Sequence, residues 1–161
     1  YDGTDAIMLS GESAQGKYPV EAVETMTKIA LKTEGTLDYA SLQRKAIRTA
    51  SLDQSEAICM SVAAIVAFTD SGFTARKMSR YRTKSMIIAA TPNEQTTRAL
   101  AINWGVKSVL CKQMDTRAAM IEYAQVIAKE NLVEPGEQII VTAGTPGVAG
   151  TTSYLELITV K

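Results

Sequence analysis

The 161-residue sequence contains no histidine and only two cysteines, Cys59 and Cys111, and these shortages exclude several kinds of site. Without histidine, the chain cannot form a catalytic dyad or triad with an imidazole base, or a zinc site with a histidine ligand. Two cysteines cannot supply a zinc site alone. Both cysteines lie in apolar surroundings and no stretch resembles a signal peptide, which predicts reduced thiols in a cytoplasmic protein.

The sequence also has no excess charge of either sign, because 17 lysines and arginines balance 17 aspartates and glutamates. It therefore offers no overall electrostatic attraction to nucleic acid or to an anionic membrane, and any anion must be held by local groups. No apolar run approaches the length of a membrane span. We expect neither nucleic acid nor a membrane as a partner.

Apolar and polar segments alternate along the chain with the lengths of strands and helices. A strand is predicted over residues 6–9, followed by helices over 20–32 and 38–48. The order then becomes helix 55–63, strand 64–68, helix 74–82, strand 86–90, helix 93–104, strand 108–111, helix 117–130, strand 138–142 and a last strand within 153–160. Such alternation predicts an α/β fold with a mainly parallel sheet flanked by helices on both faces.

One junction in this pattern is physically awkward. The helix that ends at Ala63 would become the strand that begins at Ala64 with no connecting residue, although such joints normally contain about 2–6 residues. The sequence therefore predicts that residues are missing near 62–64.

The loop between the strand 64–68 and the following helix is rich in hydroxyl groups. A glycine and several hydroxyls before a helix offer backbone N–H groups, side-chain donors and the positive end of a helix dipole, which suit a phosphate. The alternative is that Asp70 or Ser71 only caps the helix. The candidate residues are Thr69, Asp70, Ser71, Gly72, Phe73 and Thr74.

The helix after this loop carries four basic residues, which are Arg76, Lys77, Arg80 and Arg82. A solvated face is the common explanation of such a cluster, although a side chain that points back at the loop could help to bind an anion. A second loop, GTPGVAG at residues 144–150, has three glycines and a proline and hence the backbone freedom to fold over a ligand. Its alternative is a tight turn between two strands.

Three stretches together resemble pyruvate kinase. They are DGTDAIMLSGESAQGKYPVEAV at residues 2–23, the segment 64–82, and IIVTAGTPGVAGTTS at residues 139–153. The resemblance extends over nearly the whole chain. It implies that residues 1–34 are the end of a catalytic (β/α)8 barrel, its last strand and helix, and that residues 35–161 are the C-terminal allosteric domain of a longer enzyme.

The family transfers a phosphoryl group from phosphoenolpyruvate to ADP, giving pyruvate and ATP, with Mg²⁺ and K⁺ assisting in the full-length enzyme. The family's substrate-binding arginine, catalytic lysine and metal carboxylates are absent here, so this part alone is predicted to be inactive and to need no cofactor. Ser10 matches a family residue near the active site, in the hydroxyl and water network that protonates enolpyruvate. Alternatively, Ser10 and Glu12 only stabilise the loop that closes the barrel.

The resemblance also implies an effector site. The loop 69–74 would hold a phosphate of a sugar-phosphate activator such as fructose 1,6-bisphosphate, with Gly147, Ala149 and Gly150 of the second loop closing over it. Some members hold a second phosphate with a tryptophan and an arginine, but here only Arg117 aligns, and loosely, while Trp104 is interpreted as packing. A sugar monophosphate or nucleotide monophosphate therefore stays open as the effector.

Two other readings remain. The chain could be a purely structural or oligomerisation domain without a working effector site. In this reading and in the first one, the resemblance implies one subunit contact of a tetramer, across which the last strand, with Tyr154 and Leu157, could pack. It could instead be an independent small phosphatase or kinase, but it shows no nucleophile paired with a general base and no carboxylate cluster for a metal.

Overall fold

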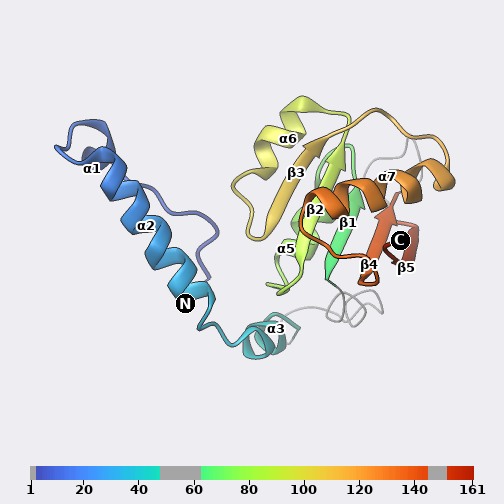
Figure 1. Cartoon of the computed structure of the whole chain (residues 1–161), viewed down its shortest axis with the longest axis horizontal. Helices are drawn as coiled ribbons and strands as arrows, with labels where there is room; N and C mark the ends of the chain where they lie inside the picture. The colour runs from blue at the N-terminus through green and yellow to red at the C-terminus, as the bar shows by residue number, and fades with distance from the viewer. Residues whose placement is uncertain (1–2, 48–62, 145–151) are drawn as a thin grey trace.

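The computed structural model describes residues 3–47, 63–144 and 152–161 (Figure 1). The N-terminal part contains α1 (Gly11–Ala14), α2 (Pro19–Glu34) and α3 (Tyr39–Ile47). The remainder contains β1 (Ala64–Phe68), α5 (Phe73–Ser79), β2 (Met86–Thr91), α6 (Glu94–Leu100), β3 (Val106–Leu110), α7 (Arg117–Glu130), β4 (Gln138–Ala143) and β5 (Tyr154–Thr159). Except for Ala63, the predicted helix 55–63 lies outside the described residues.

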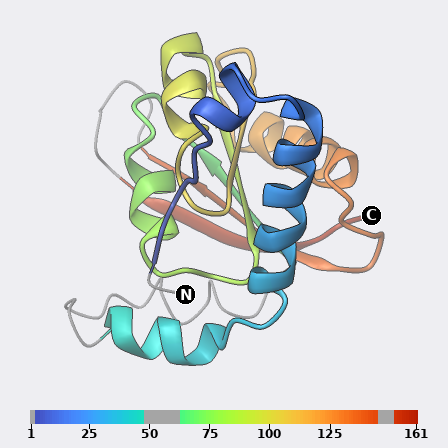
Figure 2. The ribbon, with the colours of Figure 1, turned by 90° about the vertical axis from the view of Figure 1, so that its left-hand side faces the viewer.

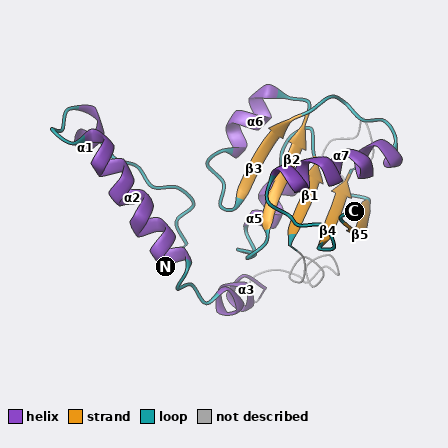
Figure 3. Ribbon diagram, in the orientation of Figure 1, coloured by secondary structure: helices purple, strands orange, loops and turns teal. Residues whose placement is uncertain are grey.

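The five described strands form one sheet in the order β3-β2-β1-β4-β5 (Figure 3). β1 pairs in parallel with both β2 and β4, in registers that place Ala64 beside Met86 and Ile139, and β2 pairs in parallel with β3. Only β5 runs antiparallel, along β4. The prediction of a mainly parallel sheet with flanking helices is confirmed.

Two layers of helices bury the two faces of the sheet. On one face, Val66, Ile88 and Val141 pack against Ile127 and its neighbours on α7. On the other face, Ile65, Ile87 and Ile140 pack with residues of α5 and α6, chiefly Ala75 and Leu100. Successive strand residues therefore enter opposite cores, which is why β1 reads as an uninterrupted apolar run in the sequence.

The N-terminal segment differs from the expectation. Residues 6–9 are extended but form no strand, and they run back along α2 (Figures 1 and 2). The prediction of a strand is wrong here because a parallel strand needs hydrogen-bonding neighbours, and no described strand lies beside it. The side chain of Met8 is accordingly 86% exposed.

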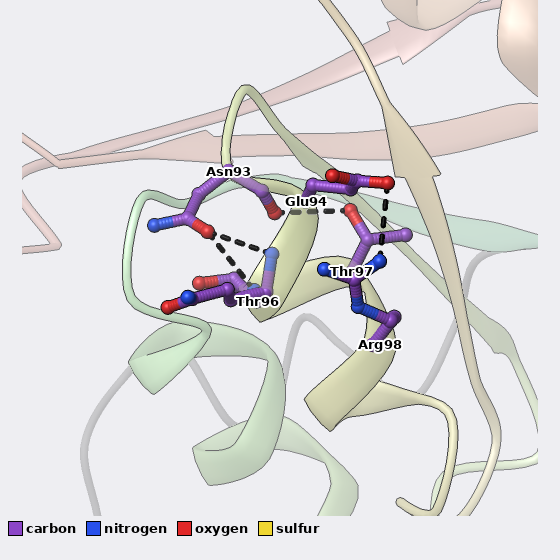
Figure 4. Close-up of polar contacts among 6 residues, drawn as sticks. Asn93, Glu94, Thr96, Thr97 and Arg98 are labelled. Atoms are coloured by element: carbon purple, nitrogen blue, oxygen red, sulfur yellow. Dashed lines mark hydrogen bonds and ion pairs between the residues drawn. The ribbon is translucent and has the colours of Figure 1, made fainter.

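Two helices end earlier than predicted. α5 stops at Ser79 rather than near Arg82, whose φ of 49° is left-handed and cannot continue a helix. α6 ends at Leu100 and is followed by Gly105 with a φ of 63°. Its beginning is capped by Asn93, whose side-chain oxygen accepts hydrogen bonds from the backbone N–H groups of Gln95 and Thr96 (Figure 4).

Candidate functional site

The loop 69–72 and the segment that follows β4 emerge at the same edge of the sheet. β1 and β4 are parallel neighbours, so their carboxyl ends lie side by side. The chain continues from β1 through α5 to β2, which lies on one side of β1, whereas β4 lies on its other side. The strand order therefore reverses between β1 and β4. Ligands of open α/β sheets bind at the carboxyl ends of strands at such a switch point.

A hydrogen bond links the start of α5, next to the first predicted loop, with the segment just before β5. The hydroxyl oxygens of Thr74 and Thr152 lie 2.9 Å apart. Thr74 is 6% exposed at the start of α5, while Thr152 is exposed just before β5. The fold thus brings Thr74 beside Thr152, two residues after the second loop. Gly147, Ala149 and Gly150 lie outside the described residues.

The backbone of the first loop is fixed from inside and from α6. The hydroxyl of Thr69 accepts a hydrogen bond from the N–H of Gly72 at 3.0 Å, and the hydroxyl of Thr96 donates to the carbonyl of Asp70 at 2.8 Å. Gly72 has a left-handed φ of 76°, which lets the chain turn directly into α5. The loop is therefore held in one shape by groups that leave Asp70 and Ser71 exposed.

Capping does not explain the hydroxyls of this loop. The residue before α5 is Gly72, and it makes no side-chain cap. Within the part of the chain that the structure describes, no hydrogen bond engages the hydroxyl of Ser71. The alternative in which Asp70 or Ser71 caps the helix is wrong, because the tight turn at Gly72 places both residues outside the capping position.

Two of the basic residues of α5 lie against the loop. Arg76 Nη2 donates to the carbonyl of Ser71 at 2.7 Å, and Lys77 Nζ lies 5.6 Å from the ring centroid of Phe73, which is 42% exposed. Arg80 points to solvent. Because the carboxylate of Asp70 would repel an anion, Asp70 could serve only through its backbone.

Arg117 is engaged with two residues of β5. Its Nη2 lies 2.8 Å from Glu156 Oε2, and its guanidinium carbon lies 4.4 Å from the ring centroid of Tyr154. The hydroxyl of Tyr154 donates to the same carboxylate. Sequence reasoning missed Tyr154 and Glu156 as partners, although their spacing of two residues places both on one face of a strand.

These contacts shift the ionisation of all three groups. Hydrogen bonds from Tyr154 and Arg117 lower the pKa of Glu156. Burial, followed by the hydrogen bond to Glu156, raises the pKa of Tyr154, and hydrogen bonds with Tyr154 and Glu156 raise the pKa of Arg117. The guanidinium of Arg117 is therefore held by the protein itself.

Ser10 lies far from these loops along the chain, before α1, and is exposed. Its backbone N–H donates to Glu12 Oε2 at 3.2 Å, while its hydroxyl does not cap α1. Hydrogen bonds from the backbone N–H groups of Glu12 and Ser10 lower the pKa of Glu12. Glu12 thus stabilises its own loop, and among the described residues no contact joins Ser10 to the loop 69–74.

Comparison with known families identifies the fold. The family model described as "Pyruvate kinase, alpha/beta domain" matches residues 45–158. The chain belongs to the pyruvate kinase family. It is 45% identical to the pyruvate kinases of Staphylococcus epidermidis, Staphylococcus saprophyticus and Staphylococcus aureus over 98% of its own length. It spans 29% of the length of these pyruvate kinases.

The alignment is also longer than the chain itself, whereas the predicted gap near residues 62–64 stays a prediction. The alignment to these pyruvate kinases extends over 168 residues, which is more than the 161 of this chain. The relatives therefore carry residues at positions where this chain has none. Val62 lies outside the described residues, whereas the N–H of Ala63 donates to the carbonyl of Gln138 at the start of the sheet.

Proposed function

We propose that this chain is the regulatory part of a pyruvate kinase that transfers a phosphoryl group from phosphoenolpyruvate to ADP. In this proposal, the loop 69–74 binds the phosphate of a sugar-phosphate effector. The observation that carries it is the hydrogen bond between Thr74 and Thr152, which ties the start of α5 to the segment before β5 at the switch point of the sheet. The hydroxyl of Ser71 has no hydrogen-bond partner among the described residues. This hydroxyl and the nearby cations Arg76 and Lys77 are the groups that a phosphate would use.

Ligand-dependent thermal stability tests the effector site. A ligand that binds the folded state raises the melting temperature, so the unchanged chain should be stabilised by millimolar fructose 1,6-bisphosphate, ribose 5-phosphate or AMP. Ser71→Ala removes one hydrogen bond to a charged group and should weaken binding by about tenfold. Gly72→Asp places a negative charge in the loop and should abolish the stabilisation.

The structure supplies controls for this experiment. Because the hydroxyl of Ser71 caps nothing, Ser71→Ala should leave the melting temperature without ligand unchanged. Ser41→Ala, on the exposed surface of α3, should change neither stability nor binding. If none of the three phosphates stabilises the unchanged chain, the effector site does not exist and only the structural function remains.

Self-association through β5 is the alternative function, and the open edge of this strand favours it. β5 pairs with β4 on one side only among the described strands, and Leu157 on it is 46% exposed. An open apolar edge of this kind is commonly covered in native proteins. Sedimentation should show an oligomer that Leu157→Lys dissociates; a monomer at high concentration would contradict this function.

The cofactors and the cytoplasmic location belong to the proposal for the whole enzyme. Mg²⁺ and K⁺ would act in its catalytic barrel, with Ser10 near the reacting enolpyruvate. Among the described residues, no three carboxylate or thiolate side chains gather into a group that fits a metal ion. None of the described helices has the length and apolar character needed to cross a membrane.

A further inference from the structure

Three hydrogen-bond donors converge on one carboxylate oxygen of β5. Arg117 Nε and Nη2 donate to Glu156 Oε2 at 3.0 and 2.8 Å, and the hydroxyl of Tyr154 donates to the same oxygen. The guanidinium of Arg117 also lies over the ring of Tyr154, which fixes its direction. A guanidinium fork and a phenol hydroxyl that point at one oxygen form an anion cradle, and here the anion belongs to the chain itself.

The anion cradle of Arg117 and Tyr154 is accessible from solution. The side chain of Arg117 is 64% exposed, whereas that of Glu156 is 31% exposed. Ion pairs as exposed as this one contribute little to stability, because solvent screens the attraction. The pair is therefore better explained by what Glu156 does to Arg117, which is to neutralise a cation that an anion from solution could otherwise reach.

The anion cradle lies in the same row of the sheet as the end of β1. Tyr154 pairs with Ala143 on β4, and Ala143 pairs with Phe68, the last residue before the loop 69–74. Neighbouring strands are about 4.8 Å apart, so the Cα atoms of Tyr154 and Phe68 are separated by about 10 Å. The candidate phosphate loop and the cradle are thus two strands apart at the carboxyl edge of the sheet.

Hydrogen bonds fix the chain between the cradle and the loop. The hydroxyl of Thr142 on β4 donates to the carbonyl of Tyr154 at 2.9 Å, and the hydroxyl oxygens of Thr152 and Thr74 lie 2.9 Å apart. The separation of the cradle from the loop 69–74 is therefore set by the fold. A sugar that carries phosphates at both ends of its carbon chain would bring its second phosphate toward the cradle.

We propose that Glu156 is an internal counter-ion that occupies the anion cradle of Arg117 and Tyr154, and that it restricts the loop 69–74 to recognition of a single phosphate. The restriction rests on the proposed phosphate site. A second phosphate would meet a guanidinium that is already neutralised, and the carboxylate of Glu156 would repel it. The ligand class is therefore a monophosphate of a sugar or nucleoside, and a bisphosphate gains nothing from its second phosphate.

Calorimetric titration of the full 161-residue chain with fructose 6-phosphate and fructose 1,6-bisphosphate tests the restriction, because the two sugars differ by one phosphate. The unchanged chain should bind both with affinities within about twofold of each other, since its second cation is neutralised. Glu156→Gln keeps the side-chain length and an acceptor oxygen but removes the charge. It should bind the bisphosphate at least about fivefold more tightly, because Arg117 can then pair with the second phosphate, and should bind fructose 6-phosphate as before.

Three variants control for other effects of the lost charge. Arg117→Ala alone should change neither affinity, whereas Arg117→Ala combined with Glu156→Gln should lose the gain for the bisphosphate. Glu94→Gln, which removes the charge of the exposed pair with Arg98, is the matched control and should change neither affinity. Arg117 and Glu156 are both partly exposed, so neither substitution leaves a buried charge without a partner.

Two results would overturn the restriction alone. One is a gain in Glu156→Gln that survives in the double variant, because it would reflect general repulsion rather than release of Arg117. The other is an unchanged chain that already prefers the bisphosphate by about tenfold or more and loses this preference in Arg117→Ala, because Arg117 would then be free to bind.

Ribose 5-phosphate and AMP, titrated into the same samples, separate failure of the restriction from failure of the effector site. If either gives binding heat while Glu156→Gln shows no tighter binding of fructose 1,6-bisphosphate, the restriction is wrong and the effector site remains. If none of the four phosphates gives heat with the unchanged chain or with Glu156→Gln, the effector site and the restriction are both overturned.

Discussion

Replacing Gly72 by alanine should lower the free energy of unfolding by more than the strained backbone conformation alone would. A left-handed φ of 76° costs an alanine about 1–2 kcal/mol. The new Cβ would also lie 3.0 Å from Leu100 Cδ2 and 2.8 Å from Arg76 Nη1. Arg76 can swing away at the loss of its bond to Ser71, but Leu100 is fully buried and cannot retreat.

Overpacking of this kind adds about 1–3 kcal/mol, so the total loss should be about 2–5 kcal/mol. Gly105→Ala provides the matched control, because Gly105 has a similar φ of 63° but no atom within 4 Å of its Cβ position. It should lose only the backbone contribution, about 1–2 kcal/mol. Urea unfolding of both variants, with slopes compared, measures the difference.

Equal losses in the two variants would refute the packing argument. A further check combines Gly72→Ala with Leu100→Ala, which makes room for the new methyl group. The double variant should then be less destabilised than the sum of the two single variants, since the substitutions share one contact. Full additivity would show that Leu100 is not what requires a glycine at position 72.

Three further changes have defined outcomes. Asn93→Ala removes the side-chain oxygen that accepts hydrogen bonds from two backbone N–H groups at the start of α6. Urea unfolding should show a free energy of unfolding lower by about 1 kcal/mol. No loss would mean that water replaces the cap. Glu156→Gln should lower the melting temperature at pH 7. The folded pKa of Glu156 is below its ordinary value of 4.5, so the stabilisation is complete above that value and the gap between wild type and variant should close as the pH falls below it. Burial, and then the charge of Asp70, raises the pKa of Cys111 above its ordinary value of 9.0. In a Cys59→Ser background, alkylation of Cys111 by iodoacetamide should therefore be slow at pH 8 and accelerate only above pH 9. Rapid reaction at pH 8 would contradict the burial of this thiol.

The sequence pattern predicted the sheet domain well because its elements are strongly periodic. α7 has the predicted bounds, and the buried strands β1, β2 and β4 lie within one residue of theirs. The predicted strand 6–9 is wrong because pairing depends on neighbours, which local pattern does not contain. The early end of α5 was also unpredictable, since it follows from the left-handed backbone of Arg82.

The candidate site was predictable in its composition but not in its contacts. The glycine and hydroxyls of the loop 69–74 predict a phosphate site there, which stays a prediction, and the loop lies at the switch point of the sheet. The contact between Thr74 and Thr152, the ion pair of Arg82 with Asp5 and the pair of Arg117 with Glu156 each join residues far apart in the sequence. Such contacts are set by the tertiary fold, so no local motif predicts them.

The central position of β1 has a consequence for synthesis of the chain. Ala64 pairs with Ile139, so one edge of β1 lacks its partner until β4 has left the ribosome. At about 5–20 residues per second, this interval lasts about 4–15 s. During it β1, β2 and β3 can form a half-sheet whose exposed edge is Ala64–Phe68, a strand without a single charged residue. A nascent chain of this protein therefore exposes the unpaired N–H and C=O groups of β1 before the strand that pairs with them has been synthesised. A chaperone that shields this apolar edge would act at this stage.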